Sequence, residues 1–188
     1  AIPGTVGGAL LADRLLRIYG PEFTVGRTVL WLLLLSIVFF SYMKQFLNGL
    51  NAIDRPKLPF IANTVFIGLN AVLNAVLIWQ FGWVGAAVAS AGSALVGLVL
   101  SYRLLVREVP VTLPVGEVLK QVAAALVMGG VVVIAERLAT TAVSAQNALV
   151  VVGLVGVGAV CYVLALLALS AKFRRTVGRN LPVDRFPV

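Results

Sequence analysis

The sequence has no histidine, one cysteine, seven acidic residues and only 12% charged residues among 188. Without histidine, the chain has no Ser-His-Asp or Cys-His pair for nucleophilic catalysis, no histidine general base and no ligand set for most zinc sites. Cys161 has no partner for an internal disulfide and lies within an apolar run, which is typical of an inert small hydrophobic residue. We therefore expect a protein that is not an enzyme.

Apolar residues dominate instead, at 61% of the chain, with a mean hydropathy of +1.04. Soluble globular domains average about 45–50% apolar and about 25% charged residues. The formal net charge is +8, but the basic residues lie at the ends of hydrophobic runs, which is the pattern of membrane flanks and not of a nucleic-acid-binding groove. The composition predicts an all-α integral membrane protein that binds no nucleic acid.

Charge-free runs predict the number of membrane crossings, since a helix crosses the roughly 30 Å hydrocarbon core with about 20 mostly apolar residues. Residues 58–102 carry no charge, and one helix of that length would reach about 68 Å, so this run must fold back. Phe81-Gly-Trp83 is the expected corner, because glycine tolerates turn geometry and tryptophan suits the membrane interface. The sequence predicts five complete spans, at about residues 26–49, 59–81, 84–103, 116–138 and 148–172.

The expected organisation has three parts. Residues 1–20 are interpreted as the end of a sixth, truncated span, which is counted as the first, so that the five complete spans are the second to the sixth. The chain starts at Ala1 without an initiator Met and inside an apolar stretch, so we expect a piece of a longer protein. A transmembrane bundle follows over residues 26–172, and a basic tail over residues 173–188. Five crossings place eleven of the 15 basic residues on the side of the tail, so the positive-inside rule predicts a cytoplasmic C-terminus. The tail is interpreted as a topology anchor, with contact to anionic lipid headgroups as the alternative.

Small residues recur every four positions in the fourth span, at Gly85, Ala89, Ser93 and Gly97. Such spacing forms a ridge along one side of a helix, and a ridge of small side chains lets another helix backbone approach closely. The ridge predicts a compact multi-helix protein and not a lone membrane anchor.

Polar residues inside the spans are the candidate substrate-binding residues. Asn63, Asn70 and Asn74 share one face of the third span, and an asparagine that faced lipid would lack hydrogen-bond partners. Two interpretations stay open for this face: hydrogen bonds between helices, or a hydrophilic cavity that binds a polar solute.

A second candidate group ends the second span, where Lys44, Gln45 and Asn48 lie close together. An ionisable group near membrane depth is a functional hypothesis by default, and snorkelling to the headgroups is the alternative. Arg27, at the opposite mouth of this span, is either a contact for an anionic ligand or a flanking charge. All seven acids lie at loop or interface positions, so we expect no metal or cofactor site; a coupling ion, H+ or Na+, stays unassigned.

Three stretches give the chain a family resemblance. They are Ile18-Tyr-Gly-Pro-Glu-Phe23, then Leu47-Asn-Gly-Leu-Asn-Ala-Ile-Asp-Arg-Pro-Lys57, and finally Asn70-Ala-Val-Leu-Asn74 followed by Phe81-Gly-Trp-Val-Gly-Ala-Ala-Val-Ala89. In this order and spacing, the chain resembles the polysaccharide flippase branch of the multidrug/oligosaccharidyl-lipid/polysaccharide exporter superfamily. The last pattern is the most specific of the three.

The resemblance implies that the chain is the second lobe of a two-lobed exporter in the plasma membrane, whose first lobe precedes it. Such flippases carry undecaprenyl- or dolichyl-linked oligosaccharides from the cytoplasmic to the outer leaflet by alternating access. On this resemblance Lys44 attracts phosphate, and Asn63, Asn70 and Asn74 hydrogen-bond sugar hydroxyls. The implied partners are membrane lipids, the lipid-linked oligosaccharide and the missing first lobe of the same chain.

Several alternatives compete with this interpretation. A multidrug exporter of the same superfamily favours acidic residues in its cavity, and this chain has none in the middle of a span. A peptidoglycan-precursor exporter fits the same residues. A non-transporting membrane assembly subunit uses the small-residue ridge only to join helices. A membrane-embedded glycosyltransferase needs a sizeable polar loop or an acidic catalytic pair, which the longest polar connection, about residues 103–117, does not provide.

Overall fold

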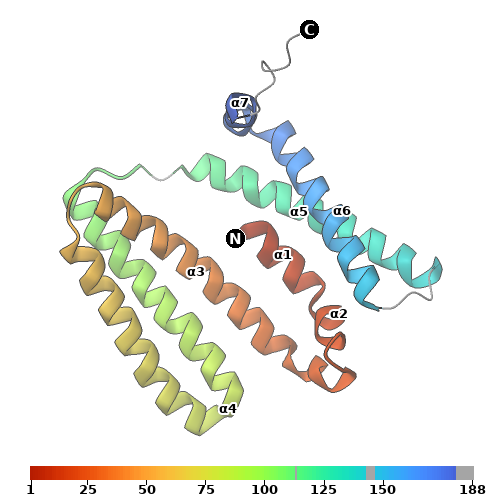
Figure 1. Ribbon diagram of the computed structural model, residues 1–188, viewed down its shortest axis with the longest axis horizontal. Coiled ribbons are helices and arrows are strands. Elements are labelled where there is room, and N and C mark those ends of the chain that lie inside the picture. The colour runs from red at the N-terminus through yellow and green to blue at the C-terminus, as the bar shows by residue number, and fades with distance from the viewer. Residues whose placement is uncertain (113, 143–146, 181–188) are drawn as a thin grey trace. The chain divides into compact units, whose positions relative to one another are not determined.

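The computed structural model describes residues 1–112, 114–142 and 147–180, and the secondary structure of these residues is helical, without strands. The chain divides into two compact units, Pro3–Leu113 and Pro114–Val188, which are described one at a time. The first unit contains α1 (Ile2–Leu10), α2 (Ala12–Arg17), the 3-10 helix η1 (Pro21–Gly26), α3 (Arg27–Ala52) and α4 (Lys57–Glu108). The second contains α5 (Val115–Ala142), α6 (Asn147–Leu169) and α7 (Ala171–Asn180), as Figure 1 shows.

Length and composition make four of the described helical segments suitable for crossing a membrane. The long helix α4 counts as one of them, although it is much longer than a bilayer requires. The four segments are Pro21–Ala52, Lys57–Glu108, Val115–Leu138 and Asn147–Leu169. Residues 1–20, predicted from the sequence to be the end of one span, divide into α1 and α2 at Leu11.

A sharp reversal divides α4 into two antiparallel arms, which lie side by side in Figure 1. The reversal occurs at Gly82, whose backbone angles of φ 57° and ψ −139° lie outside the helical region. Side chains disfavour this conformation, and glycine adopts it readily. The corner that the sequence predicts at Phe81-Gly-Trp83 is thereby confirmed.

The predicted ridge of small residues is the surface on which the second arm of α4 meets its neighbours. A Cβ atom at Gly85 would overlap the carbonyl oxygen of Leu77 in the first arm. One at Gly97 would lie 2.6 Å from Met43 Sδ of α3 and 3.4 Å from Phe66 Cβ of the first arm. Ala89 and Ser93, between these glycines, are fully buried. The close backbone approach expected from the ridge is confirmed.

Helix α3 completes the first unit by packing against both arms of α4. Its Phe40 ring lies 5.5 Å from the ring of Phe66 in the first arm. Its Phe46 ring lies 5.4 Å from that of Tyr102 in the second arm. Lipid tails are as apolar as leucine, so association of such helices depends on close packing and hydrogen bonds more than on removal of apolar surface from water. The result is a bundle in which α3 and the two arms of α4 all contact one another.

The second unit is built on the pairing of α5 with α6. A Cβ atom at Gly158 of α6 would lie 3.1 Å from Val132 of α5, so the absence of a side chain sets the distance between these helices. The buried residues of this pair are small or aliphatic: Ala124, Ala125, Met128, Val132, Val151, Leu154 and Leu166.

The substitution Gly85→Ala tests the ridge. We expect it to lower the free energy of unfolding by about 1–3 kcal/mol, because the added methyl group forces the two arms apart. The matched control is Gly68→Ala in the first arm, where a Cβ atom meets nothing within 4 Å. Removal of a glycine from an open helical position stabilises by about 0.5–1 kcal/mol. Thermal unfolding of the detergent-solubilised protein measures both; equal midpoints for the two variants would contradict this packing.

Candidate functional site

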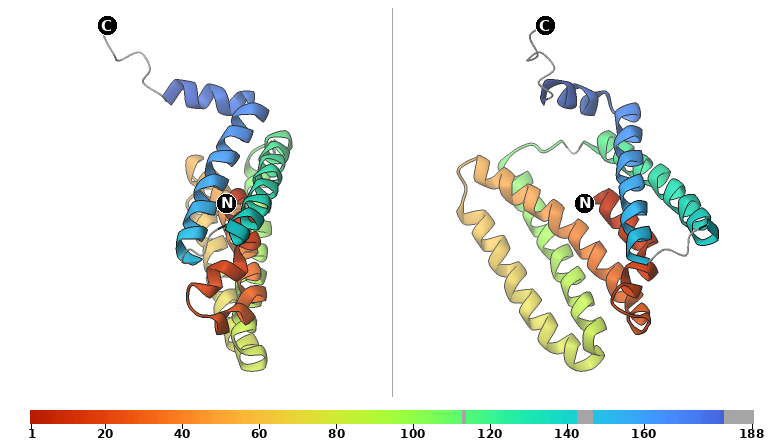
Figure 2. Two further views of the ribbon diagram at one scale, coloured as in Figure 1. Left: turned by 90° about the vertical axis from the view of Figure 1, so that its right-hand side faces the viewer. Right: turned by 45° about the vertical axis from the view of Figure 1, so that its right-hand side comes forward.

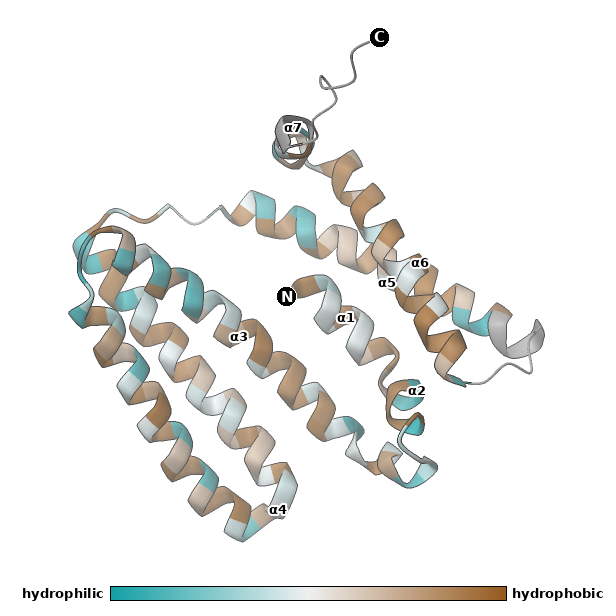
Figure 3. Cartoon of the chain, viewed as in Figure 1, coloured by the Kyte–Doolittle hydropathy of each residue, from teal (hydrophilic) through white to brown (hydrophobic). Residues whose placement is uncertain are grey.

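The C-terminal half of α3 presents a polar face. Figure 3 shows α3 apolar along most of its length and hydrophilic toward its C-terminal end. Lys44, Gln45, Asn48 and Asn51 are all exposed there. Lys44, Asn48 and Asn51 follow the helical repeat of four and three residues, so they project from one side. The structure thus brings three of the predicted binding residues together with Asn51.

The Lys44 ammonium group lies above an aromatic ring. Its Nζ atom is 5.0 Å from the centroid of Phe40, one turn earlier in α3, which is the geometry of a cation–π contact. Lys44 takes part in no ion pair among the described residues. Its positive charge is therefore available to an anionic group that reaches this face.

The asparagines of α4 divide into two groups. Asn70 Nδ2 donates a hydrogen bond of 2.8 Å to Ser93 Oγ across the two arms. Asn74 Nδ2 donates to the backbone carbonyl of Asn70 at 2.8 Å and to its Oδ1 at 3.0 Å. Ser93 Oγ in turn donates to the carbonyl of Ala89 at 2.7 Å. The bond from Asn70 to Ser93 fits the interpretation of hydrogen bonds between helices. Asn74 bonds only to Asn70 of its own arm in these interactions.

Asn63 lies outside this network and is exposed on the first arm. It lies one turn before Phe66, whose ring contacts Phe40, and Lys44 lies one turn after Phe40. Because α3 and the first arm run in opposite directions, Asn63 and Lys44 lie at a similar level of the unit. Asn63 is consequently the asparagine most accessible to a polar solute near the Lys44 face.

Arg27 is placed away from the other candidate residues, at the opposite end of α3. Its Nη1 atom donates to Asp13 Oδ2 at 2.8 Å, and its guanidinium carbon lies 5.2 Å from the centre of the Trp31 ring. Both charged side chains of the pair are about half exposed, and such pairs contribute about 0–1 kcal/mol to stability. Arg27 therefore joins α2 to the start of α3, and its role toward an anionic ligand stays a prediction.

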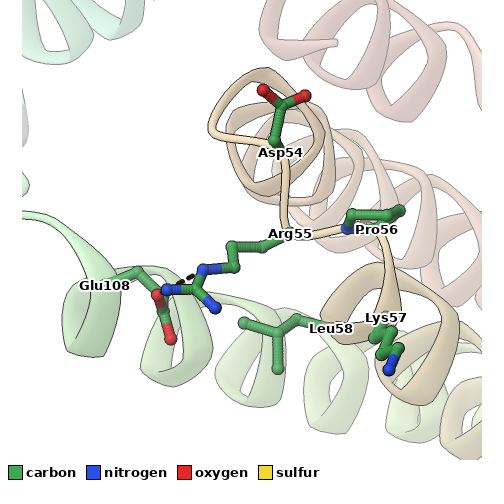
Figure 4. Close-up of a pocket in the computed structure, with 6 residues that line it drawn as sticks. All are labelled: Asp54, Arg55, Pro56, Lys57, Leu58 and Glu108. Atoms are coloured by element: carbon green, nitrogen blue, oxygen red, sulfur yellow. Dashed lines mark ion pairs between the residues drawn. The ribbon is translucent and has the colours of Figure 1, made fainter.

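An open pocket of about 460 Å³ lies beside the polar end of α3, where the loop after α3 meets the end of α4. Figure 4 shows its lining: Asp54, Arg55, Pro56, Lys57, Leu58 and Glu108. Arg55 Nε donates to Glu108 Oε2 at 3.1 Å and closes the open end of the α4 hairpin. Asp54 has a positive φ of 56°, which turns the chain sharply between α3 and α4.

The charges of this pocket do not converge on a ligand. Arg55 is already paired, and the side chains of Asp54 and Lys57 point away from the Arg55–Glu108 pair in Figure 4. The Arg55–Glu108 pair in the wall of this pocket therefore joins helices. The exposed face of α3 around Lys44 is the better candidate for binding a ligand.

Sequence reasoning missed two polar partners, Ser93 for Asn70 and Glu108 for Arg55. A signal for both was present in the sequence. A hairpin that turns at Gly82 places residues at equal distances from the turn opposite one another, and both pairs satisfy this condition to within one residue.

The second unit contains a polar junction at one end of the α5–α6 pair. Ser170, only 1% exposed, donates through Oγ to Glu117 Oε2 at 2.7 Å and accepts the backbone N–H of Phe173 at 3.1 Å. Lys120 Nζ pairs with Glu117 Oε1 at 2.8 Å. Ser170 therefore caps the start of α7 and ties it to the start of α5.

The candidate residues of the described ranges are suited to binding and offer no reactive cluster. Among those residues, no group of three or more His, Cys, Asp or Glu could hold a metal ion. Four apolar helical segments long enough to cross a membrane define a multi-pass membrane protein. The chain belongs to the lipid II flippase MurJ family, whose sequence profile matches residues 1–168.

Individual relatives agree with this family. The chain is 35% identical to the "Probable flippase AglR" of Haloferax volcanii, over 96% of this chain and 38% of the relative. It is 33% identical to the "Probable low-salt glycan biosynthesis flippase Agl15" of the same organism, over 69% of this chain and 28% of that one. It is 31% identical to the "Probable lipid II flippase MurJ" of Vibrio cholerae, over 92% and 35%. The resemblance to polysaccharide flippases is confirmed.

A solved structure shares the fold. "Lipid II flippase MurJ, inward closed conformation" superposes with a TM-score of 0.71 at 20% identity, over 94% of this chain and 36% of that one. The chain thus spans 28–38% of the length of the curated relatives it matches. The all-helical membrane fold expected from the sequence is confirmed.

The Asn70–Ser93 hydrogen bond predicts a coupling between the two arms of α4. We expect a double-mutant cycle of Asn70→Ala and Ser93→Ala to give a coupling free energy of about 0.6 kcal/mol, the average for hydrogen bonds between membrane helices. Denaturation in mixed micelles measures the four proteins of the cycle. The control pair is Asn63→Ala with Ser93→Ala, which should be additive because Asn63 lies outside the network. Equal coupling in the two cycles would contradict the assigned bond.

Proposed function

We propose that the protein is a flippase that moves lipid-linked oligosaccharide precursors from the cytoplasmic to the outer leaflet of the plasma membrane. The observation that carries this proposal is the 35% identity to a probable flippase over 96% of the chain. The physical need is clear, because a sugar headgroup cannot cross hydrocarbon unshielded, while its lipid tail stays in the bilayer. Transport by alternating access requires no covalent chemistry, which agrees with the residues available.

In this proposal the chain forms the second of two lobes, and the shares covered in the longer relatives leave room for a first lobe of the same chain. The exposed face of Lys44, Gln45 and Asn48 meets the headgroup between the lobes. The Lys44 ammonium binds phosphate, and Asn48 and Asn63 hydrogen-bond sugar hydroxyls. Asn70 and Asn74 support this face by holding the α4 hairpin in shape.

A second candidate substrate is lipid II, the precursor of peptidoglycan. The family profile and the Vibrio cholerae relative favour it. The two Haloferax relatives favour the glycan precursor. Both substrates present a sugar joined to a lipid through phosphate, so Lys44 and the amides serve either one. Flipping assays with each substrate in the same proteoliposomes decide between them.

We further propose that each arm of α4 crosses the membrane once, which gives five complete crossings and a cytoplasmic C-terminus. The reversal at Gly82 and the pairing of Arg55 with Glu108 support this arrangement, since they place the two ends of α4 together and its corner at the other end. The end with the paired termini also carries most basic residues of the first unit: Lys44, Arg55, Lys57, Arg103 and Arg107. The positive-inside rule assigns that end to the cytoplasm.

Single cysteines introduced into a Cys161→Ala background test the topology. We expect Lys57→Cys and Arg107→Cys to react with a membrane-impermeant maleimide only from the cytoplasmic side. We expect Trp83→Cys to react only from the outside, because it lies at the corner of α4. Labelling of intact cells and of inverted vesicles measures both sides. Reaction of positions 57 and 107 from opposite sides would refute the double crossing.

Lys44 tests the proposed headgroup site. In the full-length protein, we expect Lys44→Gln to slow flipping by tenfold or more. The removed charge has no ion pair among the described residues, and hydrogen bonds to ionised groups contribute about 1.5–3 kcal/mol. Lys44→Arg should retain most of the rate, since the guanidinium also binds phosphate. Proteoliposomes with a fluorescent lipid-linked oligosaccharide measure the rate.

The matched control is Lys57→Gln, which removes the same charge at the same end of the unit but outside the α3 face. It should flip substrate at nearly the normal rate. If Lys44→Gln flips as fast as Lys57→Gln, the assignment of the α3 face is wrong.

A further inference from the structure

The helix α7 (Ala171–Asn180) has a composition unlike the spans before it. It carries four basic residues and no acidic residue. It also lies beyond residues 1–168, the part of the chain that the family profile matches. Its charge is therefore a feature of this chain that membership of the family leaves unexplained.

The side chains of α7 divide into two faces. Lys172, Arg174 and Arg175 are exposed. Phe173 and Val177 are four residues apart, which places them on one side of the helix, and both are partly buried. The helix is consequently amphipathic, with a narrow apolar strip opposite a basic face.

The direction of α7 suits a membrane surface. It follows the strongly apolar α6 after a single residue, Ser170, and leaves the end of α6 at a large angle in Figure 2. The Ser170 bonds to Phe173 N–H and to Glu117 hold this bend in place. When α6 crosses the bilayer, α7 therefore begins at the bilayer surface and runs along it.

We propose that α7 is an interfacial helix that binds the anionic lipid surface next to α6. Its cations contact lipid phosphates, and Phe173 and Val177 enter the boundary between headgroups and acyl chains. Two apolar side chains give a small driving force, so the charges decide the binding. The end of a membrane span always meets lipid headgroups, and anionic lipids make that surface a polyanion, which favours lipid over a soluble acidic partner. The proposal depends on α6 crossing the membrane and not on flipping.

Fluorescence on the full-length protein tests the proposal. A nitrobenzoxadiazole label is attached at Val177→Cys, on the apolar strip, or at Ala171→Cys, an exposed position on the other side of α7, both in a Cys161→Ala background. The proteins are reconstituted into phosphatidylcholine vesicles with or without phosphatidylglycerol. We expect the emission of the Val177 label to shift to shorter wavelength, and spin-labelled lipid to quench it, in the anionic vesicles. The Ala171 label should stay accessible to acrylamide in both.

Charge variants distinguish electrostatic binding of α7 to anionic lipid from mere closeness of α7 to the bilayer. We expect Arg174→Gln with Arg175→Gln to lower the ratio of bound to free α7 by roughly 25-fold, because each cation near an anionic surface contributes about a factor of five. The matched control, Arg103→Gln with Arg107→Gln, removes the same charge from the first unit and should leave the shift unchanged. At 1 M salt, where the Debye length is about 3 Å, the shift should disappear.

Three results would overturn the proposal. A Val177 label that stays accessible to acrylamide in anionic vesicles would show that α7 lies in water. An equal shift in purely zwitterionic vesicles, unaffected by the arginine variants, would show that anionic lipid is not recognised. A shift that spin-labelled lipid does not quench would show that Val177 packs on protein. The proposed flippase activity is tested separately, by the flipping assay of the Lys44 variants.

Discussion

The reversal of α4 at Gly82 is the constraint on which the first unit depends. In lipid, helices gain little from hiding apolar surface, so their association requires backbones that approach closely and polar groups that find partners. The turn supplies both conditions at once. It places the Gly85–Gly97 ridge against the first arm and α3, and it places Asn70 opposite Ser93. Without the positive φ of Gly82, the charge-free run would be one helix about twice as long as a bilayer is thick.

The same reversal separates structural polar groups from available ones. Asn70, Asn74 and Arg55 lie where the two arms meet, and their hydrogen bonds are made within the hairpin. Lys44 and Asn48 lie on the outer side of α3 and face away from the packed surfaces. The proposed flippase needs two classes of polar group. Fixed bonds keep its helices in register, and free groups exchange partners as the substrate passes.

In the second unit, hydrogen bonds again fix the arrangement of helix ends. Ser170 caps α7, binds Glu117 and so joins the starts of α5 and α7 at the level where α6 ends. This junction fixes the direction in which α7 leaves the end of α6. A basic helix fixed in this orientation resists movement of the chain end across the bilayer, because its cations would have to leave the headgroup region. The expected topological role of the basic tail and the proposed contact of α7 with lipid therefore rest on the same geometry.

The sequence by itself determined the membrane class, the corner at Gly82, the packing role of the ridge and the family resemblance. These follow from composition, from run length and from small residues at helical spacing, all of which are local. Only the tertiary structure decided which polar residues are bound to one another, because Asn70 and Ser93 are 23 residues apart and Arg55 and Glu108 are 53 apart. A helical pattern places Asn63, Asn70 and Asn74 on one face, but the neighbouring arm decides which of them it covers. The covered residues depend on how the two arms align in the hairpin, and this alignment cannot be read from the pattern of one helix alone.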